Sequence, residues 1–139
     1  RTDAIAVHGI DEAISRANLY REAGADLLFV EAPRSIDQMR RICSEVNGPG
    51  FANNLPGGKS PYLTAQELQE IGYAVVADAT SCTYVIAHAV RELFTELART
   101  GSSAAFANRM VLFEEFNRLV GLPEIREREQ RYASLRPGR

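Results

Sequence analysis

Three short runs of the sequence decide its fold. They are Ala25-Asp26-Leu27-Leu28-Phe29-Val30-Glu31, Gly50-Phe51-Ala52-Asn53 and Tyr73-Ala74-Val75-Val76-Ala77-Asp78. Each run is mostly apolar and is bounded by glycine or proline, which is typical of parallel strands with both faces covered. The strands predicted from them begin near residues 26, 50 and 73, so each repeat takes roughly 23 to 24 residues, a spacing that accommodates one strand and one helix.

Helix signals fill the intervals between these runs. Asp11 is a candidate N-cap for the first helix. Ser35 with Gln38, and Thr64 with Glu67, have the spacing of capping boxes. We therefore predict alternating strands and helices, in which the strands are parallel and adjacent. The predicted strands span residues 26–31, 50–54 and 74–78.

The last third of the chain carries helical patterns only. We predict a long helix over Tyr84–Thr100, a second apolar helix over Ser103–Val120 and a charged helix over Glu124–Tyr132. Arg136–Arg139 is interpreted as a frayed tail.

Consecutive strand–helix units favour one half of a (β/α)₈ barrel. Three units are complete, and Arg1–Ala4 is interpreted as the tail of a fourth strand. The predicted α/β organisation is therefore the C-terminal half of a TIM barrel over residues 1–101 and a helical extension over 102–139. A small self-contained doubly wound sheet is the alternative that the pattern leaves open.

Composition narrows the possible partners and compartments. The net charge of −2 lacks the basic excess of a nucleic-acid-binding protein. No apolar run approaches the roughly 20 residues of a membrane span. Cys43 and Cys82 have no metal-site spacing, so we expect both to be reduced and the protein to be cytoplasmic.

Polar residues at the carboxyl ends of the predicted strands are the candidate site residues, because parallel α/β folds bind ligands there. Arg1 can hold a carboxylate through two parallel hydrogen bonds. Glu31 can orient that arginine or accept from a substrate hydroxyl, and Asn53 offers both a donor and an acceptor. The alternative is that Arg1 and Glu31 form a purely structural pair.

Several motifs, in this order along the chain, resemble one enzyme family. They are Arg1-Thr2-Asp3-Ala4, Tyr20-x-x-Ala23-Gly24-Ala25-Asp26-x-x-Phe29-x-Glu31-Ala32, Asn53-x-x-x-Gly57-Gly58-Lys59-Ser60-Pro61, Glu67-Leu68-x-x-Ile71-Gly72-Tyr73 and Gly121-Leu122-Pro123-Glu124 followed by Tyr132. Together they resemble the C-terminal portion of the isocitrate lyase / phosphoenolpyruvate mutase superfamily. Its members include oxaloacetate decarboxylases, 2-methylisocitrate lyases, 2,3-dimethylmalate lyases and carboxyphosphonoenolpyruvate mutases.

The resemblance implies a (β/α)₈ barrel that binds Mg²⁺ and small 2-oxo or 2-hydroxy carboxylates and works through a pyruvate-enolate-like intermediate. By the same resemblance Arg1, Glu31 and Asn53 correspond to substrate-binding residues. It also implies a homotetramer whose C-terminal helices exchange between neighbours. We therefore expect a Mg²⁺-dependent carbon–carbon lyase or decarboxylase. A phosphonomutase, or a non-catalytic remnant that only binds or oligomerises, are the alternatives.

The resemblance places the catalytic cysteine and most metal-binding carboxylates upstream of Arg1. We therefore expect no catalytic residue and no metal ligand in this chain, and no activity from it alone. Asp78-Ala79-Thr80 and Tyr84 depart from the family pattern. Tyr84 stands near the place where 2-methylisocitrate lyases tend to have an arginine, so this departure favours substrates smaller than a tricarboxylate.

Overall fold

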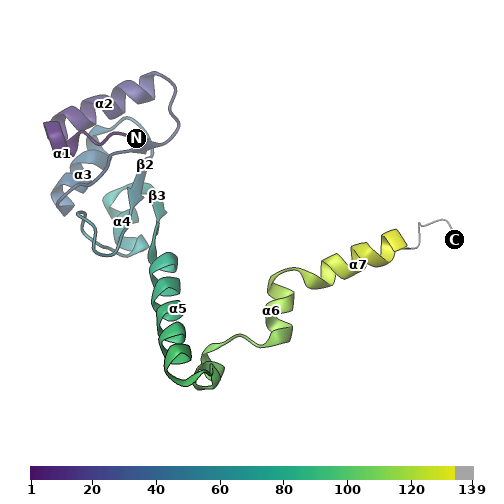
Figure 1. Cartoon of the computed structure of the whole chain (residues 1–139). Helices are drawn as coiled ribbons and strands as arrows, with labels where there is room; N and C mark the ends of the chain where they lie inside the picture. Colours follow the sequence, from purple (N-terminus) through teal and green to yellow (C-terminus); the bar gives the residue numbers. More distant parts are fainter. Residues whose placement is uncertain (134–139) are drawn as a thin grey trace. The chain divides into compact units, whose positions relative to one another are not determined.

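The computed structural model describes residues 1–133, so the expected frayed tail at Arg136–Arg139 lies outside the described residues. Helices and strands alternate over the first part of the chain and helices alone follow (Figure 1). The elements are α1 (Ile5–His8), α2 (Ile10–Glu22), β1 (Leu28–Phe29), α3 (Ile36–Glu45), β2 (Gly50–Asn53), α4 (Ala65–Ile71), β3 (Tyr73–Ala77), α5 (Ser81–Thr100), the 3₁₀-helix η1 (Ala104–Arg109), α6 (Phe113–Leu119) and α7 (Leu122–Ala133). The chain forms two compact units, the first over Arg1–His88 and the second from Ala89 onward.

The first unit contains the predicted sheet. Its strands are parallel and lie in the order β1-β2-β3, which confirms the predicted adjacency. Thr2 makes an isolated parallel bridge with Val30, so the chain start lies along β1, as expected for the tail of a further strand.

Strand β1 is shorter than predicted. Leu28 and Phe29 pair with β2, whereas Val30 pairs with Thr2 on the other side. Ala32 then adopts a positive φ of 59°, which takes the chain out of the extended conformation. These local features, rather than the apolar pattern, set the end of the strand.

Helices α2, α3 and α4 lie on one side of the strands in Figure 1. Burial alternates accordingly, with Leu28 and Ala52 buried and Phe29 and Phe51 only half-buried. One core cluster joins α1, α2 and β1, and a second joins α3 and α4 to β2 and β3 through Met39, Leu68, Ala52 and Tyr73. Helices α1–α4 therefore cover one face of the sheet, whereas the sequence predicted strands covered on both faces.

The helix caps agree only in part with the sequence prediction. Thr64 and Glu67 form the complete capping box at α4. Ser35 caps α3 by accepting from the amide of Gln38, but the Gln38 side chain accepts from Arg34 rather than from Ser35. The prediction for the first helix was wrong: Gly9 is the N-cap of α2. Asp11 lies inside its first turn and pairs with Arg41 at 2.8 Å.

The second unit differs from the prediction in one helix. The expected continuous helix over Ser103–Val120 is broken into η1 and α6, with an extended stretch between them. Arg109 at the end of η1 pairs with Glu92 of α5 at 2.6 Å and lies over the Phe106 ring at 4.7 Å. These contacts hold η1 against α5, which outweighs the helical pattern of the sequence.

The other two C-terminal helices occur as predicted, with slightly different ends. Helix α5 begins at Ser81, whose amide donates to the Asp78 carboxylate, and α7 covers Leu122–Ala133. Among the described residues no helix has the length and apolarity needed to cross a bilayer.

Candidate functional site

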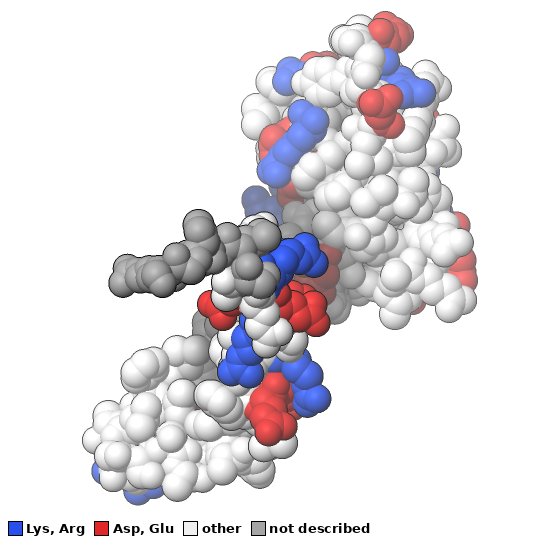
Figure 2. Space-filling model, turned by 90° about the vertical axis from the view of Figure 1, so that its right-hand side faces the viewer, with Lys and Arg blue, Asp and Glu red and all other residues white. Residues whose placement is uncertain are grey.

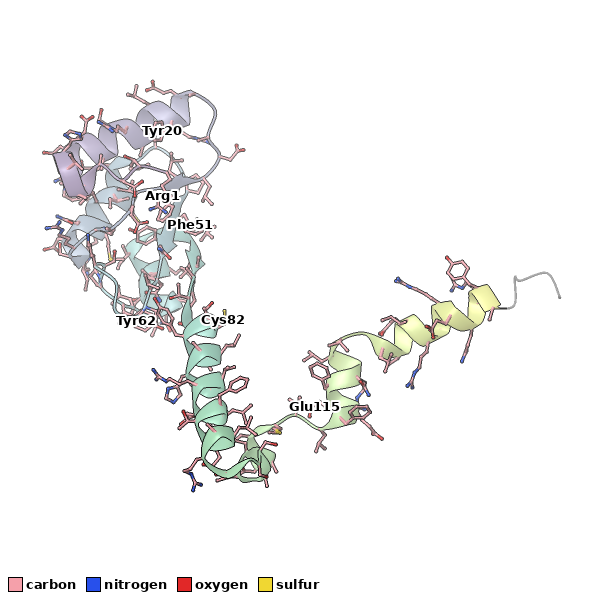
Figure 3. All side chains as sticks on the ribbon, in the orientation of Figure 1. Arg1, Tyr20, Phe51, Tyr62, Cys82 and Glu115 are labelled. Atoms are coloured by element: carbon pink, nitrogen blue, oxygen red, sulfur yellow. The ribbon has the colours of Figure 1, made fainter. Side chains whose placement is uncertain are left out.

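Arg1, Glu31 and Asn53 lie on one face at the carboxyl end of the sheet. The register pairs Phe29 with Phe51, and Glu31 and Asn53 each follow two residues later, so both point to the side of those rings. The Phe29 and Phe51 ring centroids are 4.8 Å apart, and the Arg1 guanidinium lies 5.0 Å from the centroid of Phe29. Figure 3 accordingly shows Arg1 beside Phe51. This is the face that α2, α3 and α4 leave open.

Acidic groups already hold the guanidinium of Arg1. Its Nε and Nη2 donate to the two carboxylate oxygens of Asp3 at 3.2 and 2.8 Å. Its Nη2 also lies 3.4 Å from Oε2 of Glu31. The hydrogen bond with Arg1 lowers the pKa of Asp3 and raises the pKa of Arg1, so both groups are charged near neutrality. The predicted pairing of Arg1 with Glu31 is present, and Asp3 is the stronger partner.

Glu31 carries an unsatisfied acceptor. Its Oε2 is buried and receives no hydrogen bond from any described residue. A buried carboxylate oxygen without a donor is costly unless a ligand supplies one. The next residue, Ala32, has a positive φ, a conformation that non-glycine residues seldom adopt and that often occurs at functional sites.

Asn53 shares the face with Arg1 and Glu31, but no hydrogen bond joins it to them in the described chain. It lines a small cavity with Ala32 and Ser60. The neighbouring Asn54 has a structural role, because its amide donates to the carbonyl of Leu63 at 2.7 Å and its Oδ1 accepts from the Leu63 amide at 3.2 Å. Asn54 thus closes the loop that follows β2.

A cavity of about 450 Å³ opens beside Glu31. Its lining includes the two acidic residues Asp3 and Glu31, and Gly57, Gly58 and Lys59 of the closed loop. Sequence reasoning did not include Lys59 among the candidate site residues, because strand ends guided the choice and Lys59 lies well past the end of β2. A lysine in a glycine-rich loop after a strand was the available signal.

Two further ionisable side chains, those of Asp78 and Cys43, have structural roles. Asp78 accepts hydrogen bonds from Ser81 at the start of α5, and these bonds lower its pKa. Burial raises the pKa of the Cys43 thiol to about 11, which keeps it protonated and a poor acid–base catalyst at neutral pH. The described residues contain no group of three side chains able to hold a metal ion.

Comparison with known proteins gives a consistent picture. The family model described as phosphoenolpyruvate phosphomutase matches residues 1–98. The chain is 42% identical over 136 residues to 2,3-dimethylmalate lyase of Eubacterium barkeri, covering 98% of this chain and 47% of that protein. It is 39% identical over 139 residues to the chloroplastic carboxyvinyl-carboxyphosphonate phosphorylmutase of Arabidopsis thaliana, covering 98% of this chain and 41% of that one.

Solved structures agree with these sequence matches. A crystal structure of 2,3-dimethylmalate lyase, described as a PEP mutase/isocitrate lyase superfamily member, matches with a TM-score of 0.86 and 26% identity, covering 95% of this chain and 46% of that one. Phosphonopyruvate hydrolase in complex with oxalate and Mg²⁺ matches with a TM-score of 0.76 and 26% identity, covering 93% and 46%. The chain thus spans about half the length of the relatives that it matches.

Proposed function

The chain belongs to the PEP mutase/isocitrate lyase superfamily, and on this premise we propose that it is part of a carbon–carbon lyase or decarboxylase. The proposed substrates are small 2-oxo or 2-hydroxy carboxylic acids. The observation that carries this proposal is the unsatisfied, buried Oε2 of Glu31 beside the guanidinium of Arg1. A 2-hydroxy acid complements this pair, since its hydroxyl donates and its carboxylate accepts.

The chain's own residues then have distinct roles. Arg1 is fixed by Asp3 and Phe29, so its remaining N–H groups meet a substrate carboxylate in a defined orientation. Glu31 accepts the hydrogen bond of the 2-hydroxyl, whose proton must leave as the adjacent carbon–carbon bond breaks and the hydroxyl becomes a keto group. Asn53 supplies an amide at the same end of the sheet.

Mg²⁺ is part of the proposal, by analogy with phosphonopyruvate hydrolase, whose structure contains Mg²⁺ and oxalate. When bound, the ion would stabilise negative charge on the enolate oxygen. By the family resemblance we assign most of its ligands to another part of the whole protein; residues 1–133 contain no group of three His, Cys, Asp or Glu side chains that could hold a metal ion. The acid that protonates the departing carbon is assigned there too.

The open face of the sheet supports the barrel-half architecture over residues 1–101. A self-contained doubly wound sheet has helices on both faces, whereas α2, α3 and α4 lie on one face only (Figure 1). In the proposed barrel, Phe29 and Phe51 point to the interior and the polar residues after them form part of its mouth. The helical extension is proposed for residues 102–139, of which the structure describes residues 102–133.

The extension is proposed to mediate a homotetramer by helix exchange. Several large apolar residues of the second unit are highly exposed, including Leu112 at 73%, Phe113 at 81% and Leu119 at 76%. Figure 2 shows a largely uncharged surface in the lower part of the view. Large apolar side chains as exposed as Leu112, Phe113 and Leu119 usually mark an interface.

A phosphonomutase is the second candidate, favoured by the 39% identity to the Arabidopsis phosphorylmutase. A substrate panel on the whole protein separates the two. With Mg²⁺ we expect cleavage of 2,3-dimethylmalate or oxaloacetate at a kcat on the order of 1 to 100 per second, and no rearrangement of phosphonopyruvate. Residues 1–139 assayed alone should show no turnover. Rearrangement of the phosphonate without any carbon–carbon cleavage would replace the lyase proposal by the mutase.

A further inference from the structure

Lys59 is the cation that faces the cavity beside Glu31 without a partner among the described residues. Asp3 and Glu31, which line the same cavity, both lie against Arg1. No hydrogen bond or ion pair joins Lys59 to any residue of the described chain. The guanidinium of Arg1 already donates to Asp3 through two nitrogens, so the ammonium of Lys59 is the more available group for an incoming anion.

Lys59 differs from the other basic residues of the chain in its side chain, and it lies in a closed loop. Lys59 is its sole lysine, since the other 15 of the 16 basic residues are arginines. A lysine carries a compact ammonium with three donors on a flexible stem, which suits contact with a carboxylate across an open cavity. The loop that carries it is closed by the two hydrogen bonds between Asn54 and Leu63, so Lys59 stays near the cavity rim.

The charges around the cavity favour the same role. Asp3 and Glu31 line the cavity, and Arg1 lies against both without lining it, so these three groups carry a net charge of about −1 when ionised, which disfavours entry of an anion. Lys59 brings the sum around the cavity to about zero.

We propose that Lys59 binds a carboxylate of the substrate in this cavity, as a second cation in addition to Arg1. This inference rests on the proposed function, because it assigns a residue to the same site. It identifies the substrate as an anion with a carboxylate within reach of the loop at Gly57, Gly58 and Lys59.

The test uses the whole protein that contains this chain. Lys59→Met removes the charge and keeps much of the length, Lys59→Arg keeps the charge, and Arg40→Met removes a charge from α3. Arg40 is the matched control, because it pairs with Asp37 and does not line the cavity. KM and kcat are measured for 2,3-dimethylmalate, and the dissociation constant of oxalate is measured by calorimetry with Mg²⁺ present.

Lys59→Met should raise the KM for 2,3-dimethylmalate about tenfold and change kcat less than about threefold, since a binding contact is lost. Lys59→Arg and Arg40→Met should stay within about threefold of the wild type in both constants. In the wild-type protein, saturating 2,3-dimethylmalate should slow acetylation of Lys59, followed by mass spectrometry, at least about threefold. Oxalate should bind Lys59→Met more weakly than it binds the wild type.

Two failures can be told apart. If the wild type turns over 2,3-dimethylmalate but Lys59→Met keeps the wild-type KM and Lys59 is acetylated at the same rate with and without substrate, the inference is overturned and the proposed function stands. If the wild type neither turns over any substrate of the panel nor binds oxalate, both the proposed function and the inference about Lys59 are overturned.

Discussion

Arg1 is held on two sides before any substrate arrives. Asp3 accepts from two of its nitrogens, and its Cζ lies over the Phe29 ring, 5.0 Å from the ring centroid. A planar guanidinium in this setting presents its remaining N–H groups in a fixed direction, which a lysine ammonium cannot reproduce.

Arg1→Lys in the whole protein should therefore lower kcat/KM for 2,3-dimethylmalate at least about tenfold, although the charge is kept. The loss arises from geometry, because lysine cannot donate to Asp3 and a carboxylate in one plane. Steady-state kinetics is the measurement, with Arg40→Lys as the control on the outer surface of α3. A value of kcat/KM equal to that of the wild type would remove Arg1 from the site.

Individual site residues could be predicted from the sequence where they lie at the ends of regular strands. Arg1, Glu31 and Asn53 were identified because side chains at the ends of parallel strands share an edge, and the structure puts all three on one face. The position of Lys59 beside the cavity could not be predicted, because the course of a glycine-rich loop depends on closing contacts such as those of Asn54. The roles of the three predicted residues in substrate binding stay predictions.

The capping box of α4 is the clearest stabilising device at the scale of elements. The Thr64 hydroxyl accepts from the Glu67 amide at 3.2 Å, and the Glu67 carboxylate accepts from the Thr64 amide at 2.8 Å. The helix is only seven residues long, so its cap satisfies a large share of its free amides. It also carries Leu68, which is fully buried in the core with β2 and β3.

Thr64→Ala should lower the free energy of unfolding by about 1 kcal/mol, the usual cost of losing an N-cap. Urea unfolding of the whole protein, followed by circular dichroism, is the measurement. Ser44→Ala is the control: Ser44 lies within α3 and bonds only to a carbonyl of its own helix, so the change should be within about 0.5 kcal/mol. Equal stability of Thr64→Ala and the wild type would show that the capping box is dispensable.

Elements could be predicted wherever local signals agree. The three strands, α4 and α5 follow from apolar runs, glycines and caps, whereas Asp11 was misassigned because Gly9 with a φ of 88° takes the cap position instead. The prediction of a continuous helix over Ser103–Val120 was wrong. Hydrophobic periodicity does not report the contacts of Arg109 with Glu92 and Phe106.

For the whole molecule, the second unit has large apolar residues that its own helices do not cover, Leu112, Phe113 and Leu119 among them. We expect the whole protein to form a tetramer that buries them. Light scattering at micromolar concentration should give the mass of four chains, and Phe113→Asp should shift the mass towards smaller species. A monomeric wild type would contradict helix exchange.

We propose that this chain contributes the substrate-binding end of a lyase site. The most direct test is a crystal structure of the whole protein with Mg²⁺ and oxalate, the pair present in the phosphonopyruvate hydrolase complex. We predict an oxalate oxygen within about 3 Å of donor groups of Arg1 or Asn53, with Glu31 beside them. Oxalate bound at a place that none of these three side chains reaches would contradict the account.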